Sequence, residues 1–237
     1  MSEEKPHSRI DINQATAIFE DSQGWFKSAW VAALNALIPF LGPVVVIGWG
    51  RALYEHGLTE PNQLTEVAFE RDLNIGKDTA PGILGWPAAL LAIDGLRRIL
   101  VWGTGLLLRQ LTEHLGPDLL VQLEVLLYGG SRLASWAVTL LWIPWVLLLP
   151  ELVRRVYQGD AFPWQNPGPS MLAIKMNLDG YQKVVVMSGI VLGVSWIVSG
   201  VFGWLALFVA PLAWAVLVHL AAQWHRVVAD HGVPGTV

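Results

Sequence analysis

The chain has 237 residues, of which 54% are hydrophobic and only 14% are charged, with a net charge of −4 and no cysteine. An ordinary soluble domain carries about 25% charged residues, so this composition excludes a water-soluble globule and requires lipid or a large partner interface over the apolar surface. Because the basic residues nowhere form a stripe that could displace counterions from phosphates, we also exclude a nucleic-acid-binding protein. Without cysteine there are no disulfides and no thiolate metal sites.

Residues 1–27 are acidic from the start and contain no apolar core, so the sequence predicts a cytoplasmic N-terminal segment rather than a cleavable secretory signal. Residues 28–227 then form a single helical membrane domain, and residues 228–237 form a tail. Thirteen tryptophans agree with a membrane location, because indole rings favour the membrane interface.

The first apolar run, residues 28–50, is interrupted by Pro39, Gly42 and Pro43. The two prolines remove backbone donors, which predicts either one kinked membrane crossing or a re-entrant hairpin. Asn35 precedes Pro39 by one turn, and we expect its side chain to bond the carbonyls freed by that proline rather than a substrate. The polar connector that follows is expected to contain a short surface helix over 64–71.

Two weaker apolar runs, residues 80–93 and 99–108, are separated by Asp94, Arg97 and Arg98. Their spacing predicts a self-neutralising cluster at the membrane edge. The alternative is a buried ion or proton site. The leucine spacing of residues 109–130 predicts a helix at the interface or packed on the bundle.

Residues 133–150 form an 18-residue charge-free run in which we expect a break at Pro144. In the connector that follows, residues 151–183, the prolines between 162 and 169 forbid a continuous helix. Ser170 is predicted to cap a short amphipathic helix over 171–177.

The longest charge-free run, 184–225, holds 42 residues, enough for two crossings. It predicts a C-terminal transmembrane hairpin of residues 184–199 and 204–223, turning between Gly200 and Gly203. Gly189, Gly193 and Gly200 form a stripe of small residues, expected to pack on the second helix of the hairpin, with contact to another copy as the alternative. His219 is predicted to be neutral and bonded to a neighbouring helix.

Residues 28–79 and 133–183 share an order of features and are possibly two related halves. Each has an Ile-Pro pair followed by an arginine and a tyrosine three residues apart, Arg51 with Tyr54 and Arg154 with Tyr157. We expect these tyrosines to reach the lipid headgroups. The alternative is that the shared features recur by chance in an apolar chain.

The distribution of Lys and Arg bears on topology. The charges divide almost evenly if 28–50 is one kinked crossing among five. They lean to one side if that element is re-entrant, or if residues 94–98 form a tight turn between two of six spans. Both biased arrangements place the two termini and the 151–183 connector in the cytoplasm.

The order of motifs in the first half, from Phe19-Glu20-Asp21 through Ile38-Pro39 to Ile47-Gly48-Trp49, resembles the opening of domain-of-unknown-function family 4013. The segment 157–181 and the closing hairpin resemble its second half. These are polytopic membrane proteins of bacteria and archaea, so the resemblance implies a helical membrane fold. It implies no biochemical activity and no catalytic residue.

The sequence therefore predicts an all-α polytopic membrane protein with about four to six membrane helices, some proline-broken or re-entrant. We find no catalytic motif and expect no catalytic, cofactor or metal residue. The leading functional prediction is a non-enzymatic structural or accessory subunit of an assembly in the inner membrane. Its partners would be the lipid bilayer and other membrane subunits or further copies. The alternatives are a transporter or channel for a small solute or lipid, and a lipid-modifying enzyme for which no residue set is evident.

Overall fold

The computed structural model describes residues 10–20, 23, 27, 30–38, 41–59, 69–110 and 116–230, and the side chains of all of these except 69–72. Over these residues the backbone is almost entirely helical and contains no strand, so the all-α prediction is confirmed. The chain divides into two compact units. The first comprises Met1–Ile83 and Leu148–Val237, and the second comprises Leu84–Leu147.

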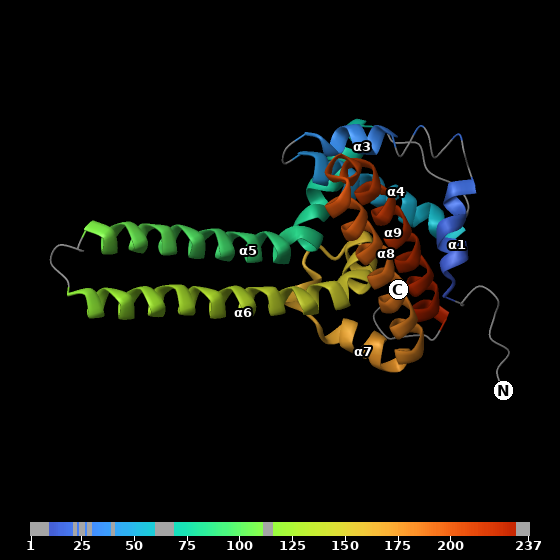
Figure 1. Cartoon of the computed structure of the whole chain (residues 1–237). Helices are drawn as coiled ribbons and strands as arrows, with labels where there is room; N and C mark the ends of the chain where they lie inside the picture. The colour runs from blue at the N-terminus through green and yellow to red at the C-terminus, as the bar shows by residue number, and fades with distance from the viewer. Residues whose placement is uncertain are drawn as a thin grey trace. The chain divides into compact units, whose positions relative to one another are not determined.

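Helix α9 (Ala206–Asp230) is the centre of the first unit. Helices α1 (Ile12–Thr16), α3 (Trp30–Ala36), α4 (Leu41–Thr59) and α8 (Leu178–Val201) pack against it, as Figure 1 shows. From Ala213 to Val228 nearly every side chain of α9 is buried. A helix that is apolar on all sides can be enclosed in this way.

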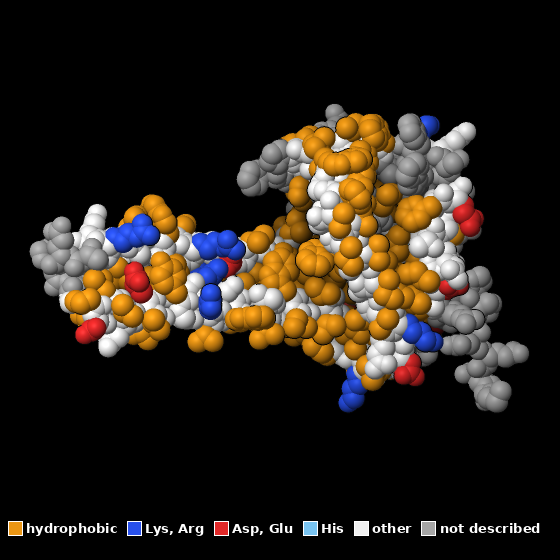
Figure 2. Space-filling view, in the orientation of Figure 1, with side chains coloured by type: hydrophobic (Ala, Val, Ile, Leu, Met, Phe, Trp, Pro, Cys, Tyr) orange, Lys and Arg blue, Asp and Glu red, His pale blue; other side chains and the backbone are white. Residues whose placement is uncertain are grey.

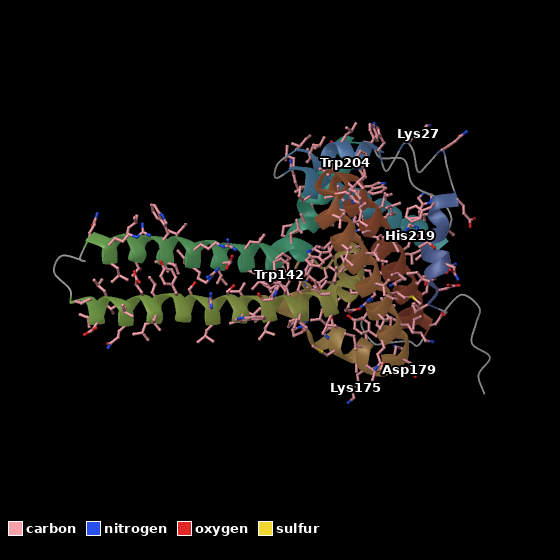
Figure 3. All side chains as sticks on the ribbon, in the orientation of Figure 1. Lys27, Trp142, Lys175, Asp179, Trp204 and His219 are labelled. Atoms are coloured by element: carbon pink, nitrogen blue, oxygen red, sulfur yellow. The ribbon has the colours of Figure 1, made fainter. Side chains whose placement is uncertain are left out.

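The predicted C-terminal hairpin is confirmed. Helix α8 ends at Val201, the short 3-10 helix η5 (Gly203–Leu205) makes the turn, and α9 returns along α8. Figure 3 shows Trp204 at this turn, whereas Lys175 and Asp179 lie at the opposite end of the hairpin. The helices are longer than the charge-free run indicated, because α8 already begins at Leu178.

Helices α5 (Phe69–Gln110) and α6 (Pro117–Tyr157) each begin in one unit and end in the other. Within the second unit, residues 84–110 and 117–147 lie side by side and antiparallel (Figure 1). The indole nitrogen of Trp86 donates to the Leu141 carbonyl at 3.1 Å, and Arg97 bonds Ser131 further along the pair.

The structure excludes one arrangement that the sequence left open for this region and corrects two expectations. Residues 94–98 form no turn, because α5 continues through them, which excludes the six-span arrangement built on that turn. Residues 117–130 are helical as predicted but form the first part of α6 and not a helix of their own, while residues 111–115 lie outside the described residues. Helix α6 is not broken at Pro144. A proline inside a helix removes one hydrogen bond, and the flanking turns of α6 carry the helix across that position.

The first apolar run is broken where the sequence indicated. Helix α3 ends at Ala36 and α4 begins at Leu41, while Pro39 lies outside the described residues. Gly42 donates its N–H to the Ile38 carbonyl at 2.8 Å, and a Cβ at Gly42 would lie 2.5 Å from the Asn35 carbonyl oxygen. Pro43 occupies the first turn of α4, where its missing N–H has no partner to lose. Of the helix predicted over 64–71, residues 64–68 lie outside the described residues, and 69–71 belong to the first turn of α5.

The 151–183 connector is more helical than expected. Helix α6 continues to Tyr157, and the short 3-10 helix η4 (Pro163–Gln165) precedes α7 (Gly168–Met176). Ser170 lies inside α7 and is not its N-cap, a position that Pro167 occupies.

Three helical segments are long and apolar enough to cross a membrane among the residues that the structure describes. They are Pro117–Tyr157, Leu178–Val201 and Gly203–Asp230. In their most apolar stretches, only 17% and 11% of the residues of the first two are buried, against 56% for the third. One apolar helix thus serves as a core, and the other two present their apolar side chains outward.

Candidate functional site

The centre of the first unit contains a buried ion pair. Arg154 donates from Nε and Nη2 to the two carboxylate oxygens of Glu151, both at 2.8 Å. The two side chains are 2% and 1% exposed. Their spacing of three residues places both on one face of α6. Because two parallel bonds join planar groups, the geometry of both side chains is closely defined.

The ion pair is linked to α9 directly through Trp224 and indirectly through Gln158 and His225. The indole nitrogen of Trp224 donates to Glu151 Oε2 at 2.6 Å, and Arg154 Nη1 donates to Gln158 Oε1 at 2.7 Å. Since the Gln158 oxygen accepts from Arg154, its amide nitrogen donates to His225 Nδ1, 2.7 Å away. His225 is therefore the neutral tautomer protonated on Nε2 in this arrangement.

Two tyrosines lie beside this network. The rings of Tyr54 and Tyr157 are 5.5 Å apart, and Tyr157 donates its hydroxyl to the Ile47 carbonyl at 2.8 Å. Burial raises the pKa of Tyr54 above its usual value. Both side chains are enclosed by protein, so the expectation that these tyrosines reach the headgroups is wrong.

Arg155, the neighbour of Arg154, organises the connector instead. Its Nη1 donates to the carbonyls of Pro163 and Asn166 at 3.1 and 2.7 Å and to Ser170 Oγ at 3.0 Å. Its Nη2 also pairs with Asp160. One guanidinium thus joins the end of α6 to the proline-rich segment and to α7.

Asn35 bonds within its own helix. Its amide nitrogen donates to the Val31 carbonyl at 2.9 Å, while the Asn35 carbonyl accepts from the Ile38 N–H at 3.0 Å. Pro39 has no N–H for the Asn35 carbonyl, but the Ile38 N–H already occupies that carbonyl. The Asn35 side chain therefore does not bond it.

His219 is also held by its own helix, not by a neighbouring one as expected. It is 1% exposed, and its Nδ1 lies 2.9 Å from the Ala215 carbonyl. Because a carbonyl only accepts, Nδ1 carries the proton. Its Nε2 has no hydrogen-bond partner among the described residues.

In the second unit, Asp94 pairs with both arginines of its cluster. Arg97 donates from Nε and Nη2 to Oδ1 at 2.9 and 2.7 Å, and Arg98 donates from Nε to Oδ2 at 2.7 Å. Bonds from Arg98 and Arg97 hold the pKa of Asp94 below its usual value. This is the pairing that the spacing predicted.

The glycine stripe of α8 is open. A Cβ at Gly189, Gly193 or Gly200 would meet no atom within 4 Å, so the expected packing against α9 is not what the structure shows. Close approaches between segments occur at other glycines, among them Gly50 and Gly76. A Cβ at Gly50 would lie 2.4 Å from both Trp214 Nε1 and Tyr157 Oη.

The sequence interpretation missed the buried network because it assigned Glu151 and Arg154 to a polar connector. One signal was available. Glu151 and Arg154 have the same spacing of three residues as Asp94 and Arg97, and both pairs adjoin apolar runs. Nothing in the sequence indicated that Trp224 and His225 join this network, because their contacts depend on how α9 packs against the end of α6.

No cluster of three or more potential metal ligands occurs in the part of the chain that the structure describes. No protein-family model, curated protein or solved structure matches the chain.

Proposed function

We propose that this chain is a non-enzymatic structural or accessory subunit of a membrane assembly, and that α8 is its main contact surface. The observation that carries the proposal is the outward apolar face of α8. Val186, Ile190 and Ile197 are each about 60% exposed, and Trp196 is 79% exposed. A continuous apolar face of this kind requires lipid or another protein.

The open glycine stripe indicates that part of this face contacts a helix of another subunit, and not lipid alone. Gly189, Gly193 and Gly200 lie on one side of α8 and leave a shallow strip with no protein atom above it. In a bilayer, small residues promote association because they let two helix backbones approach closely. The rest of the face would contact acyl chains.

The membrane arrangement is part of the same proposal. We expect the protein to lie in the inner membrane with both termini in the cytoplasm. Helices α8 and α9 would cross the membrane as a hairpin. The resemblance to domain-of-unknown-function family 4013 implies a helical membrane fold and supplies no activity.

Association should respond to bulk on the stripe. In purified full-length protein, we expect a complex larger than a monomer at low detergent, measured by light scattering, and its loss when Gly189→Leu and Gly193→Leu are combined. The matched control is Val194→Leu, an exposed position of α8 outside the stripe. The melting temperature should not fall in any of these variants, because the added side chains meet open space. Only monomer at every detergent level would contradict the proposal.

A small-solute or lipid transporter remains the second hypothesis, but Asn35 and Asp94, on which it depended, both have partners on their own helices. Flux through liposomes that is abolished by a combined Asn35→Ala and Asp94→Ala change would favour it over the subunit.

A further inference from the structure

A pocket between α5 and α6 in the second unit gathers arginine side chains. Its volume is about 390 Å³, and its lining includes Arg97, Arg98 and Arg109 from α5 and Tyr128 and Ser131 from α6. Among the residues that the structure describes, no aspartate or glutamate lines it. Figure 2 shows blue side chains along this helix pair among orange and white ones.

The side chain of Arg97 lines the pocket and is held in place by hydrogen bonds on two sides. Its guanidinium is held on one side by Asp94 and on the other by Ser131, with Nη1 2.5 Å from Ser131 Oγ. The second bond reaches across to α6, so the pocket is preorganised by a contact between the two helices. A ligand would meet this cation without having to order it first.

Arg98 is the available binding group. Its side chain is 73% exposed and uses only Nε in its bond to Asp94. Its terminal nitrogens make no hydrogen bond to any residue that the structure describes. A guanidinium in this state presents donors with the spacing that suits two oxygens of a phosphate.

The surroundings of the pocket are apolar. Trp102 lines it and is 69% exposed, and Ile99 and Leu126 on the same two helices are equally open. Each arginine costs about 2.5–3.5 kcal/mol at the centre of a bilayer on insertion scales. Three arginines beside exposed aliphatic and aromatic side chains therefore suit the headgroup level of a membrane, where tryptophan and tyrosine are also enriched.

We propose that this pocket binds the phosphate of an anionic phospholipid. Arg98 and Arg109 contact the phosphate oxygens, and Trp102 and Tyr128 pack against the glycerol and the first acyl carbons. Inorganic phosphate would satisfy the cations but leave the apolar rim in water, whereas an amphiphile covers both. This binding is independent of whether the protein assembles through α8.

The test uses the purified full-length protein in neutral detergent, with lipid binding followed by native mass spectrometry. Phosphatidylglycerol and phosphatidylcholine with identical acyl chains are compared, and inorganic phosphate is added as a competitor. We expect phosphatidylglycerol to bind more tightly and Arg98→Gln to weaken it at least about tenfold, which corresponds to about 1.4 kcal/mol. Arg98→Lys, which keeps the charge but not the fork, should fall between the two.

Arg132→Gln is the matched control. It removes the same charge from an exposed position of α6 that does not line the pocket, so binding should persist. Because Arg98 is exposed, its variant should keep the wild-type melting temperature. Equal binding of the two lipids, or equal losses in Arg98→Gln and Arg132→Gln, would overturn the proposal. Displacement of the lipid by inorganic phosphate at equal concentration would identify a free anion as the ligand and overturn it too.

Discussion

Arg154 and Arg155 show how strongly the role of a residue depends on its helical phase. Neighbours on a helix point about 100° apart, so Arg154 faces Glu151 and α9 while Arg155 faces the connector and α7. A buried cation is tolerated where a carboxylate and further hydrogen bonds balance it. Glu151, one turn earlier on the same helix, supplies that balance.

Removing the carboxylate should therefore be costly. Glu151→Gln leaves Arg154 as a buried charge without a counter-ion, and we expect a loss of about 3–5 kcal/mol in unfolding free energy. Thermal unfolding in a fixed detergent, followed by tryptophan fluorescence, measures the change. A combined Glu151→Leu and Arg154→Leu variant should recover much of the loss, because it removes both charges.

Glu55→Gln is the control for this prediction. It breaks an ion pair of similar length, Arg51 with Glu55 at 2.8 Å, but those side chains are 29% and 50% exposed. Exposed pairs contribute about 0–1 kcal/mol. Similar melting temperatures for the Glu151 and Glu55 variants would show that the buried pair has no special weight.

At the scale of elements, α4 and α9 cross closely because Gly50 has no side chain. Gly50→Ala would force its Cβ into Trp214 and Tyr157, and overpacking of this kind costs about 1–3 kcal/mol. Gly189→Ala meets open space and should be neutral or stabilising by up to about 1 kcal/mol, since alanine favours a helix. Melting temperatures of the two variants in the same detergent compare them, and equal values would contradict the packing described.

Two hydrogen bonds made by Gln223 join Asp11, the N-cap residue of α1, to α9. Gln223 Oε1 accepts from the Asp11 N–H at 2.7 Å, and Gln223 Nε2 donates to the Asp11 carbonyl at 2.9 Å. We expect Gln223→Leu to release α1, seen as faster proteolysis at the N-terminal end with a small change in melting temperature. Gln14→Ala, which loses only a 3.4 Å contact with Arg226, should keep the wild-type cleavage rate. Equal cleavage rates in the two variants would show that Gln223 does not hold α1.

At the scale of the whole molecule, the absence of native cysteine makes topology directly measurable. Lys175 and Trp204 are exposed and lie at opposite ends of the α8–α9 hairpin (Figure 3). In intact cells, a membrane-impermeant maleimide should label Trp204→Cys, whereas Lys175→Cys should react only after permeabilisation. Labelling of both from one side would contradict a membrane-crossing hairpin with a cytoplasmic connector, and the unmodified chain gives the background.

Helix α6 sets a second constraint on how the molecule meets a bilayer. Its 41 residues correspond to about 60 Å of helix, roughly twice the hydrocarbon thickness. Only part of α6 can therefore lie in hydrocarbon. The charge-free residues 133–150 are the part that the sequence assigns there.

By itself, the sequence determined that the chain is all-helical, that it has helices long and apolar enough to cross a membrane, and that it ends in a hairpin. All three follow from how long a segment stays apolar and uncharged. It did not determine that α9 is the core and α8 the outer helix, since lipid and protein interior are both apolar and hydropathy does not distinguish them. Nor did it indicate that α5 continues through Asp94 or α6 through Pro144. Only the tertiary structure decided where Glu151, Arg154 and Trp224 meet, because a buried charge depends on a partner that packing brings to it.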